Sequence, residues 1–389
     1  MAGERRDDGG RVREVAGVFL RLGATAFGGP AAHVALMDRE IVERRGWVDR
    51  QTFLDLLAAT NLIPGPNSTE MAIHLGYHRA GVRGLVAAGV CFIVPAMLIV
   101  LGFAWFYREY GSLPQVEWVL WGIKPVILAV VAQARWGLGK TALRGWPPAA
   151  LAAAVAAGSL LGAGEVTLLL GAGLASIAAA RVRHWAAPGA GLALLWPAAA
   201  EAAGAVGAMG GAAVAPTLAK LTLFFLKVGS VLYGSGYVLL AFLQADLVDR
   251  WGWLTSTELL DAVAVGQFTP GPVFTTATFV GYLVAGLPGA LLATGGIFLP
   301  SFLFVGLLSP LVPRMRRSRI LASFLDGVVA GSFALMAVVT WYLGRAALPD
   351  PWTWLLALGS LGVLLRWRVN SAWLVAAGGV AGLLRYLAG

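Results

Sequence analysis

The sequence contains little charge for its length. Only 13% of its 389 residues are Asp, Glu, Lys or Arg, whereas 58% are hydrophobic; soluble globular proteins carry about 25% charged residues. Soluble, fibrous and disordered classes are therefore excluded, and apolar segments that can cross about 30 Å of hydrocarbon indicate an integral membrane protein. The apolar residues occur in blocks rather than in alternation, which excludes an outer-membrane barrel.

The sequence also lacks the common signatures of metal and cofactor sites. The single cysteine, Cys91, lies in an apolar segment, so neither a disulfide framework nor a cysteine metal cluster is expected. His-Glu-x-x-His, phosphate-binding and Gly-x-Ser-x-Gly motifs do not occur, and we expect no cofactor. The net charge is +9, but Lys and Arg cluster between apolar blocks as in cytoplasmic loops, so nucleic acid is not an expected partner.

An internal repeat is present. A shift of 206 positions aligns Gly46-Trp47-Val48 with Gly252-Trp253-Leu254 and Pro64-Gly65-Pro66 with Pro270-Gly271-Pro272. After a slip of one residue, a shift of 205 positions continues the alignment. Agreement of so many rare residues is not chance in an Ala/Leu-rich chain, so the chain consists of two related halves.

Apolar segments within the halves predict membrane-spanning helices. They are about 85–106, 117–139, 147–162 and 166–181 in the first half, and 289–312, 320–343, 352–365 and 371–387 in the second. The expected organisation is an N-terminal tail at 1–14 without a cleaved signal peptide, a first transmembrane repeat at 15–187, an Ala/Gly-rich linker at 188–216 and a second repeat at 217–389.

The charge distribution predicts that the repeats have opposite orientations. Arg79 and Arg83 follow the first Pro-Gly-Pro motif, whereas the equivalent segment 281–289 has no charge. Since Lys and Arg mark the cytoplasmic side, equivalent loops lie on opposite sides. The expected fold class is an all-α polytopic membrane protein of two inverted-topology repeats, with Gly/Pro-broken helices at the repeat interface, an architecture of many secondary transporters.

Glycine and proline interrupt the apolar helices at four symmetric positions. Broken backbone at membrane depth is tolerated only inside protein or beside a watery cavity, and the N–H groups of the next half-helix attract anions. The residues predicted to bind an anion are Gly28, Gly29, Pro30, His33, Asn61, Pro64, Gly65, Pro66, Asn67, Ser68, Thr69, Ser235, Gly236, Gln267, Pro270, Gly271, Pro272, Thr275 and Thr276. The alternative is that each break is a kink that only packs helices.

Arg21 and Lys227 are equivalent cations inside apolar segments. A cation within a membrane is costly and is a functional hypothesis by default, so both are predicted to attract the anion. The alternative is that their side chains extend to the membrane surface. Lys124 is a third such cation, and its equivalent is Val329.

Three carboxylates are candidates for coupling transport to protons. Asp55 and Asp261 are equivalent, and each could instead cap a helix or form a salt bridge; Glu70, just beyond Pro66, has the better depth for a proton carrier. Glu70, His74 and His78 share one helix face with metal-ligand spacing, but the second half has no such set, so no metal is expected.

At these same residues the chain resembles the chromate ion transporter family in its long, two-domain form. The resemblance is carried by residues 19–33, 46–48 and 61–77, and by their echoes at 225–236 and 267–282. It implies a secondary transporter, not an enzyme, that exports chromate across the cytoplasmic membrane with proton or sulfate coupling. The second half departs from the motif at Gly234-Ser235-Gly236 and at 273–275, which implies that the halves contribute unequally.

Two alternatives stay open. The substrate can be sulfate or another oxyanion, or the protein can be a membrane scaffold or a metal-dependent membrane enzyme that uses Glu70 and His74. The expected partners are chromate, sulfate and the lipid bilayer, and a homodimer is compatible with the sequence.

Overall fold

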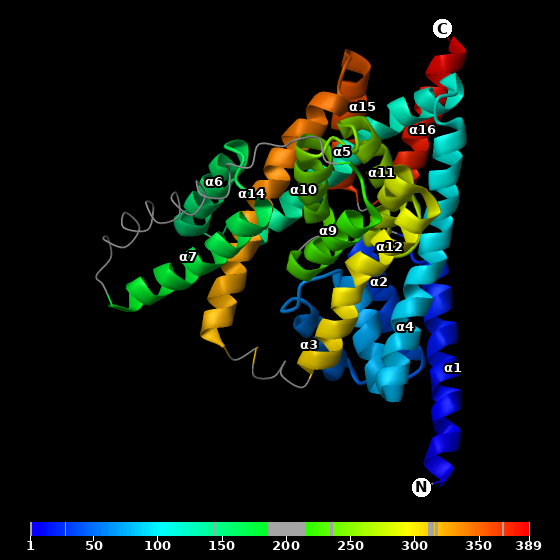
Figure 1. Ribbon diagram of the computed structural model, residues 1–389, viewed down its shortest axis with the longest axis vertical. Coiled ribbons are helices and arrows are strands. Elements are labelled where there is room, and N and C mark those ends of the chain that lie inside the picture. The colour runs from blue at the N-terminus through cyan, green and yellow to red at the C-terminus, as the bar shows by residue number, and fades with distance from the viewer. Residues whose placement is uncertain are drawn as a thin grey trace.

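The structure, a computed structural model, describes the chain except residues 1, 28, 144, 186–214, 234–235, 310–314, 316–317, 368 and 389. Every element in the described part is helical (Figure 1). The first half contains α1 (Ala2–Thr25), α2 (Gly29–Met37), the π-helix η1 (Asp38–Arg44), α3 (Arg50–Thr60), α4 (Asn67–Tyr110), α5 (Pro114–Ala142), α6 (Trp146–Leu160) and α7 (Glu165–Trp185). The second contains α9 (Leu218–Val231), η2 (Gly236–Val238), α10 (Leu239–Phe242), the π-helix η3 (Leu243–Arg250), α11 (Ser256–Phe268), η4 (Val273–Thr275), α12 (Thr276–Leu308), α14 (Arg319–Ala347), α15 (Pro351–Arg366) and α16 (Ser371–Ala388).

The chain is a multi-pass membrane protein. Within the part of the chain that the structure describes, five helical segments are long and apolar enough to cross a membrane: Asn67–Tyr110, Pro114–Lys140, Val273–Leu308, Arg319–Ala347 and Ser371–Ala388. Each of the predicted spanning segments coincides with a helix, although α6 ends at Leu160 and α12 at Leu308, slightly before the predicted limits. The predicted linker lies mostly outside the described residues.

The two halves fold alike, element by element. Gly46 and Gly252, which are equivalent, have φ angles of 59° and 63°. Gly81 (φ 58°, ψ −149°) and Gly286 (φ 63°, ψ −154°) are also equivalent and nearly identical in conformation. Positive φ disfavours residues with a Cβ atom, so these glycines fix the same turns in both halves.

Helix α4 is two helices that fold back on each other at Ala80 and Gly81, where the backbone is not helical. A Cβ atom on Gly76 would collide with the backbone of Gly84, although eight residues of straight helix would separate these positions by about 12 Å. We call the arms α4a (residues 67–79) and α4b (residues 82–110). Helix α12 repeats this turn in the second half, and its arms are α12a (residues 276–284) and α12b (residues 287–308).

The first half begins with two helical hairpins beside α4b. Glu14 pairs with Arg79 at 2.8 Å, and further along α1 the ring of Phe19 contacts that of Phe92, so α1 runs parallel to α4b. Arg45, just after η1, pairs with Glu14 at 3.0 Å, so α2 and η1 return along α1. Trp47, shortly before α3, donates to Glu14 at 3.2 Å, and α4a ends at Arg79, which also pairs with Glu14. The break between α1 and α2 and the break between α3 and α4a therefore each lie at the tip of a helical hairpin.

The long arms of the two halves pack antiparallel. Near one end of α4b, Cδ1 of Leu85 lies 3.8 Å from the point where a Cβ atom on Gly306 of α12b would stand. At the other end of α4b, Nη1 of Arg108 lies 3.9 Å from the point where a Cβ atom on Gly286 would stand, directly before α12b begins. The last three helices of each half pack across the two halves (Figure 1). Helix α5 of the first half packs on α15 and α16 of the second, and α14 of the second half packs on α6 and α7 of the first.

Candidate transport site

The breaks of the two halves meet through a reciprocal pair of backbone hydrogen bonds. The N–H of Gly65 donates to the carbonyl oxygen of Leu232 at 2.8 Å, and the N–H of Gly271 donates to that of Ala26 at 2.9 Å. Gly65 and Gly271 are equivalent, as are Ala26 and Leu232. Broken helices leave backbone groups unpaired, and here each half satisfies the other.

The meeting point lies halfway along a spanning helix. A Cβ atom on Gly271 would collide with Ala96 and lie 3.2 Å from the carbonyl oxygen of Gly23. Ala96 is in the middle of α4b, about 20 Å from each end at the rise of an α-helix. The φ angles of Gly65 and Gly271, 139° and 87°, also require glycine at both positions.

Glu70 is fully buried beside this point, at 0% exposure. Its Oε1 lies 3.5 Å from the hydroxyl of Ser301 on α12b, a residue that sequence reasoning missed. Its Oε2 has no hydrogen-bond partner among the described residues. Glu70 forms no ion pair within the described chain, so its charge would be uncompensated. We call Gly65, Thr69, Glu70 and Ser301 the break site.

Further buried polar atoms near the first-half breaks lack partners in the described structure. They are Oγ1 of Thr69, Nε2 of His74 and Nδ1 of His33. The other ring nitrogens are occupied, because His74 Nδ1 lies 3.2 Å from the hydroxyl of Ser309 and His33 Nε2 lies 3.0 Å from the carbonyl oxygen of Ala26. Buried polar groups are normally hydrogen-bonded, so this region is suited to a polar guest.

The remaining predicted residues of the first half are placed around these breaks. Pro64, Pro66 and Ser68 are buried. Asn67 donates from its side chain to that of Asn61 at 2.9 Å, and Asn61 is exposed. Gly29 and Pro30 begin α2, whereas Gly28 lies outside the described residues.

In the second half the hydroxyls are used locally. Thr275 donates to the carbonyl oxygen of Pro272 and Thr276 to that of Val273, both at 2.8 Å. Gln267 and Pro270 are buried, and Gly236 lies against Phe274. Ser235 lies outside the described residues. The hydroxyls of Thr275 and Thr276 are thus engaged, unlike that of Thr69.

Arg21 and Lys227 each pair with a carboxylate. Arg21 pairs with Glu40 at 2.6 Å, and Lys227 pairs with Asp246, which also binds Arg250 at 2.7 Å. These pairs tie α1 to η1 and α9 to η3, and both cations are partly exposed. Sequence reasoning missed Glu40 and Asp246, although the 206-residue shift makes them equivalent.

Asp261 and Asp55 have different surroundings. Asp261 is buried, accepts a hydrogen bond from the Tyr107 hydroxyl at 2.9 Å and lies 3.3 Å from Nζ of Lys124. These groups line a cavity of about 380 Å³. Asp55 is only partly buried and accepts from Gln51 at 3.3 Å. Within the described residues no group of three His, Cys, Asp or Glu side chains could hold a metal ion.

These features define the class of the protein: a multi-pass membrane protein of two like halves, whose broken helices meet inside the bundle beside buried polar groups. The profile of the family described as "Chromate transporter" matches residues 13–177 and 219–383, so the chain belongs to the chromate transporter family. Membership places the chain among transporters, not enzymes.

Individual relatives are similar to the chain over most of its length. The chain is 33% identical to a protein named "Chromate transport protein" from Cupriavidus metallidurans, over 96% of this chain and 93% of the relative. It is 32% identical to a "Probable chromate transport protein" from Synechococcus elongatus, over 92% and 91%. It is also 32% identical to a "Chromate transport protein" from Pseudomonas aeruginosa, over 83% and 78%. No solved structure matches the chain.

Proposed function

We propose that this protein is a secondary transporter that exports chromate across the cytoplasmic membrane and binds the anion where the broken helices meet. The observation that carries this proposal is the reciprocal contact of Gly65 with Leu232 and of Gly271 with Ala26. This contact joins broken backbone from both halves halfway along α4b, and its support for the proposal is that repeat transporters bind their substrates near the midplane of the membrane. The relatives named for chromate transport supply the substrate.

The proposal includes inverted topology of the two repeats. The antiparallel packing of α4b and α12b supports it, as do the two equivalent hydrogen bonds across the break site. Two repeats related in this way can adopt each other's conformation, so the site opens to one side and then to the other.

We assign the anion to the start of α4a. The N–H groups of the first residues of a helix are not used within it and carry partial positive charge. Those of Asn67 and Ser68 are in this position, and the unpaired hydroxyl of Thr69 adds a further donor. A tetrahedral dianion such as chromate accepts hydrogen bonds from several directions. Arg21 and Lys227 then act by positioning α1 and α9, because carboxylates already bind them.

We assign proton coupling to Glu70. A charged Glu70 carboxylate, buried without a cation, would repel a dianion at the neighbouring N–H groups. A proton on Glu70 removes this repulsion and leaves a hydroxyl donor, so proton binding and anion binding favour each other. One proton and one chromate dianion together carry one net negative charge. A negative-inside membrane potential drives this charge outward with about 2.3 kcal/mol per 100 mV, so export of the two together remains favourable.

The experiment that tests this function is uptake of labelled chromate into inverted membrane vesicles. We expect uptake above that of empty vesicles, sensitivity to an imposed proton gradient, and inhibition by sulfate if the site accepts other tetrahedral dianions. Absence of uptake, with the protein verified in the membrane, would contradict the chromate assignment. Uptake of labelled sulfate alone would replace chromate by sulfate.

A further inference from the structure

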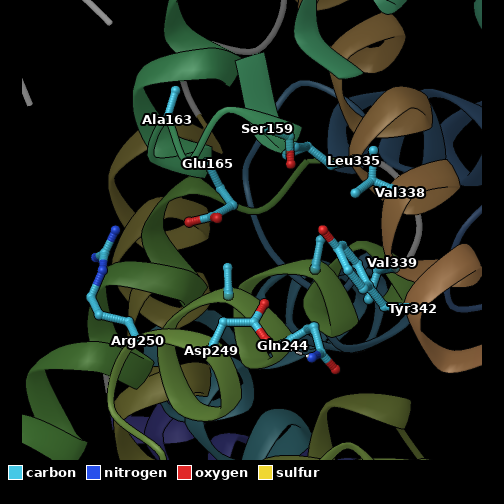
Figure 2. Close-up of a pocket in the computed structure, with 13 residues that line it drawn as sticks. Ser159, Ala163, Glu165, Gln244, Asp249, Arg250, Leu335, Val338, Val339 and Tyr342 are labelled. Carbon is cyan, nitrogen blue, oxygen red and sulfur yellow. Dashed lines mark hydrogen bonds between the residues drawn. The ribbon is translucent and has the colours of Figure 1, made fainter. Parts of the chain in front are cut away.

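Glu70 differs from the other buried carboxylates of the described chain, because no cation lies beside it. Three of the others form ion pairs: Glu40, Asp246 and Asp261. The fourth, Glu165, lies at a cavity of about 230 Å³ that Arg250 also lines, and Figure 2 shows both side chains around this space. Glu70 therefore loses its charge only by taking up a proton, which has to cross the protein interior to reach it.

His74 lies one turn further along the same face of α4a. It follows Glu70 by four residues, so the two Cβ atoms are about 5–6 Å apart, and side chains of a helix lean toward the preceding turn. His74 is only 3% exposed, and its Nε2, like Oε2 of Glu70, has no hydrogen-bond partner among the described residues. Adjacent turns thus carry a buried nitrogen that can donate a proton and a buried oxygen that can accept it.

The other ring nitrogen of His74 connects it to one end of the bundle. Nδ1 lies 3.2 Å from the hydroxyl oxygen of Ser309, which directly follows α12b and is partly exposed. His78, one further turn along α4a, is exposed. Arg79 and Arg83 lie at this same end, so it is the predicted cytoplasmic side. His74 therefore stands between the buried carboxyl of Glu70 and the cytoplasmic end of the bundle.

An apolar layer separates Glu70 from this end. It is a cluster of four side chains that are each at most 5% exposed: Ile63, Ile73, Leu85 and Val305. Ile73 directly precedes His74, so the layer lies at the depth of the histidine. Water does not fill closely packed apolar space, and a proton crosses such a layer only on a side chain that can bind and release it.

We infer that His74 relays protons between the cytoplasmic side and Glu70, an inference that rests on the proposed role of Glu70 in coupling. The hydroxyl of Ser309 passes its proton to Nδ1 of neutral His74 and takes another from solvent. The charged ring then releases the proton of Nε2 to Oε2 of Glu70, directly or through one water molecule. The carboxylate becomes a neutral acid and the ring is again neutral, so no charge stays in the apolar layer. The reverse steps return the proton.

The polar groups that face this route come from two elements of the second half. Helix α12b contributes the hydroxyls of Ser301 and Ser309, and the first break of that half places Tyr233 within electrostatic reach of Glu70. A phenol ordinarily ionises near pH 10, so Tyr233 keeps its proton at neutral pH. The second half has no relay of its own, because the equivalent segment 276–281 contains no titratable side chain.

The test is hydrogen–deuterium exchange of the Glu70 carboxyl group in the purified full-length protein without chromate, followed by infrared spectroscopy after rapid mixing with D₂O. The C=O stretching band of the protonated carboxyl group shifts when deuterium replaces hydrogen, and Glu70→Gln identifies the band by removing it. His74→Phe should slow the exchange at least tenfold and leave the intensity of the band at equilibrium unchanged. His78→Phe is the matched control, since water reaches this exposed residue, and should change the rate by less than about twofold.

Added imidazole distinguishes a relay from a structural role, because it should restore exchange in His74→Ala by carrying protons where the ring has been removed. His74→Gln serves in place of His74→Phe if the latter fails to fold. Two results would overturn the inference: unchanged exchange in the folded His74 variants, or the absence of a Glu70 band at every pH at which the wild type is folded. Slowed exchange without chromate uptake in vesicles would support the relay and contradict the transport function alone.

Discussion

The two repeats share a backbone but differ in their buried polar groups. Both have breaks at Pro-Gly-Pro, helical turns at equivalent glycines, and a cation paired with the returning π-helix. Glu70, however, has Thr276 as its equivalent, and Lys124 has Val329. The common backbone provides two interchangeable halves of a bundle, whereas the polar side chains determine which break binds substrate.

The largest effect is expected from a change in the shared backbone. Gly65→Ala places a Cβ atom against Glu70 and Ser301, and Gly271→Ala places one against Ala96, both at positive φ. Each should lower chromate uptake at least tenfold and destabilise the fold by about 1–3 kcal/mol. Gly102→Ala is the control, since no atom lies within 4 Å of its Cβ position. Normal uptake by both break variants would show that the breaks need not meet as described.

The next effect distinguishes the two breaks. Glu70→Gln should abolish the dependence of chromate uptake on the proton gradient, because the amide cannot exchange a proton. Thr276→Val, at the equivalent position, should retain that dependence, since its hydroxyl only donates to the carbonyl oxygen of Val273. Uptake would be measured in vesicles with matched protein content. Loss of gradient dependence in Thr276→Val alone would reverse the assignment of the two halves.

A third test concerns the aspartates, which are equivalent in sequence but not in environment. Lys124→Met removes the cation beside buried Asp261 and should destabilise the protein by about 3–5 kcal/mol. The double variant Lys124→Met, Asp261→Asn should recover much of this loss, because no uncompensated carboxylate remains. Asp55→Asn should change the unfolding free energy by less than about 0.5 kcal/mol. An equal loss in Asp55→Asn and Lys124→Met would contradict the described asymmetry.

The smallest effects are expected at the two cations of α1 and α9. Arg21→Gln leaves Glu40 paired with Arg44 and Arg45, whereas Lys227→Gln leaves Asp246 with Arg250. Chromate uptake should fall less than threefold in both, with the larger loss in Lys227→Gln. A drop of tenfold or more with normal expression would return these residues to the anion site.

The sequence predicts the repeat, the breaks and the spanning helices because these depend on local properties, namely Gly and Pro positions and apolar length. The turn at Ala80 and Gly81 is not predicted, since neither residue forces a helix to reverse and the turn depends on close packing of Gly76 on Gly84. Contacts between distant segments were also missed. The sequence predicts Glu70 as a carboxyl of suitable depth, but its neighbour Ser301 is more than 200 residues away in the chain. The different surroundings of Asp55 and Asp261 arise only from tertiary packing.

The central claim is that a proton on Glu70 and an anion at the start of α4a favour each other. It is tested most directly by equilibrium binding of labelled chromate to the purified protein as a function of pH, for the wild type and Glu70→Gln; the variant accounts for any protonation of chromate itself. We expect the affinity for chromate to rise more steeply in the wild type than in Glu70→Gln as the pH falls. Identical pH dependence in both proteins would contradict the claim.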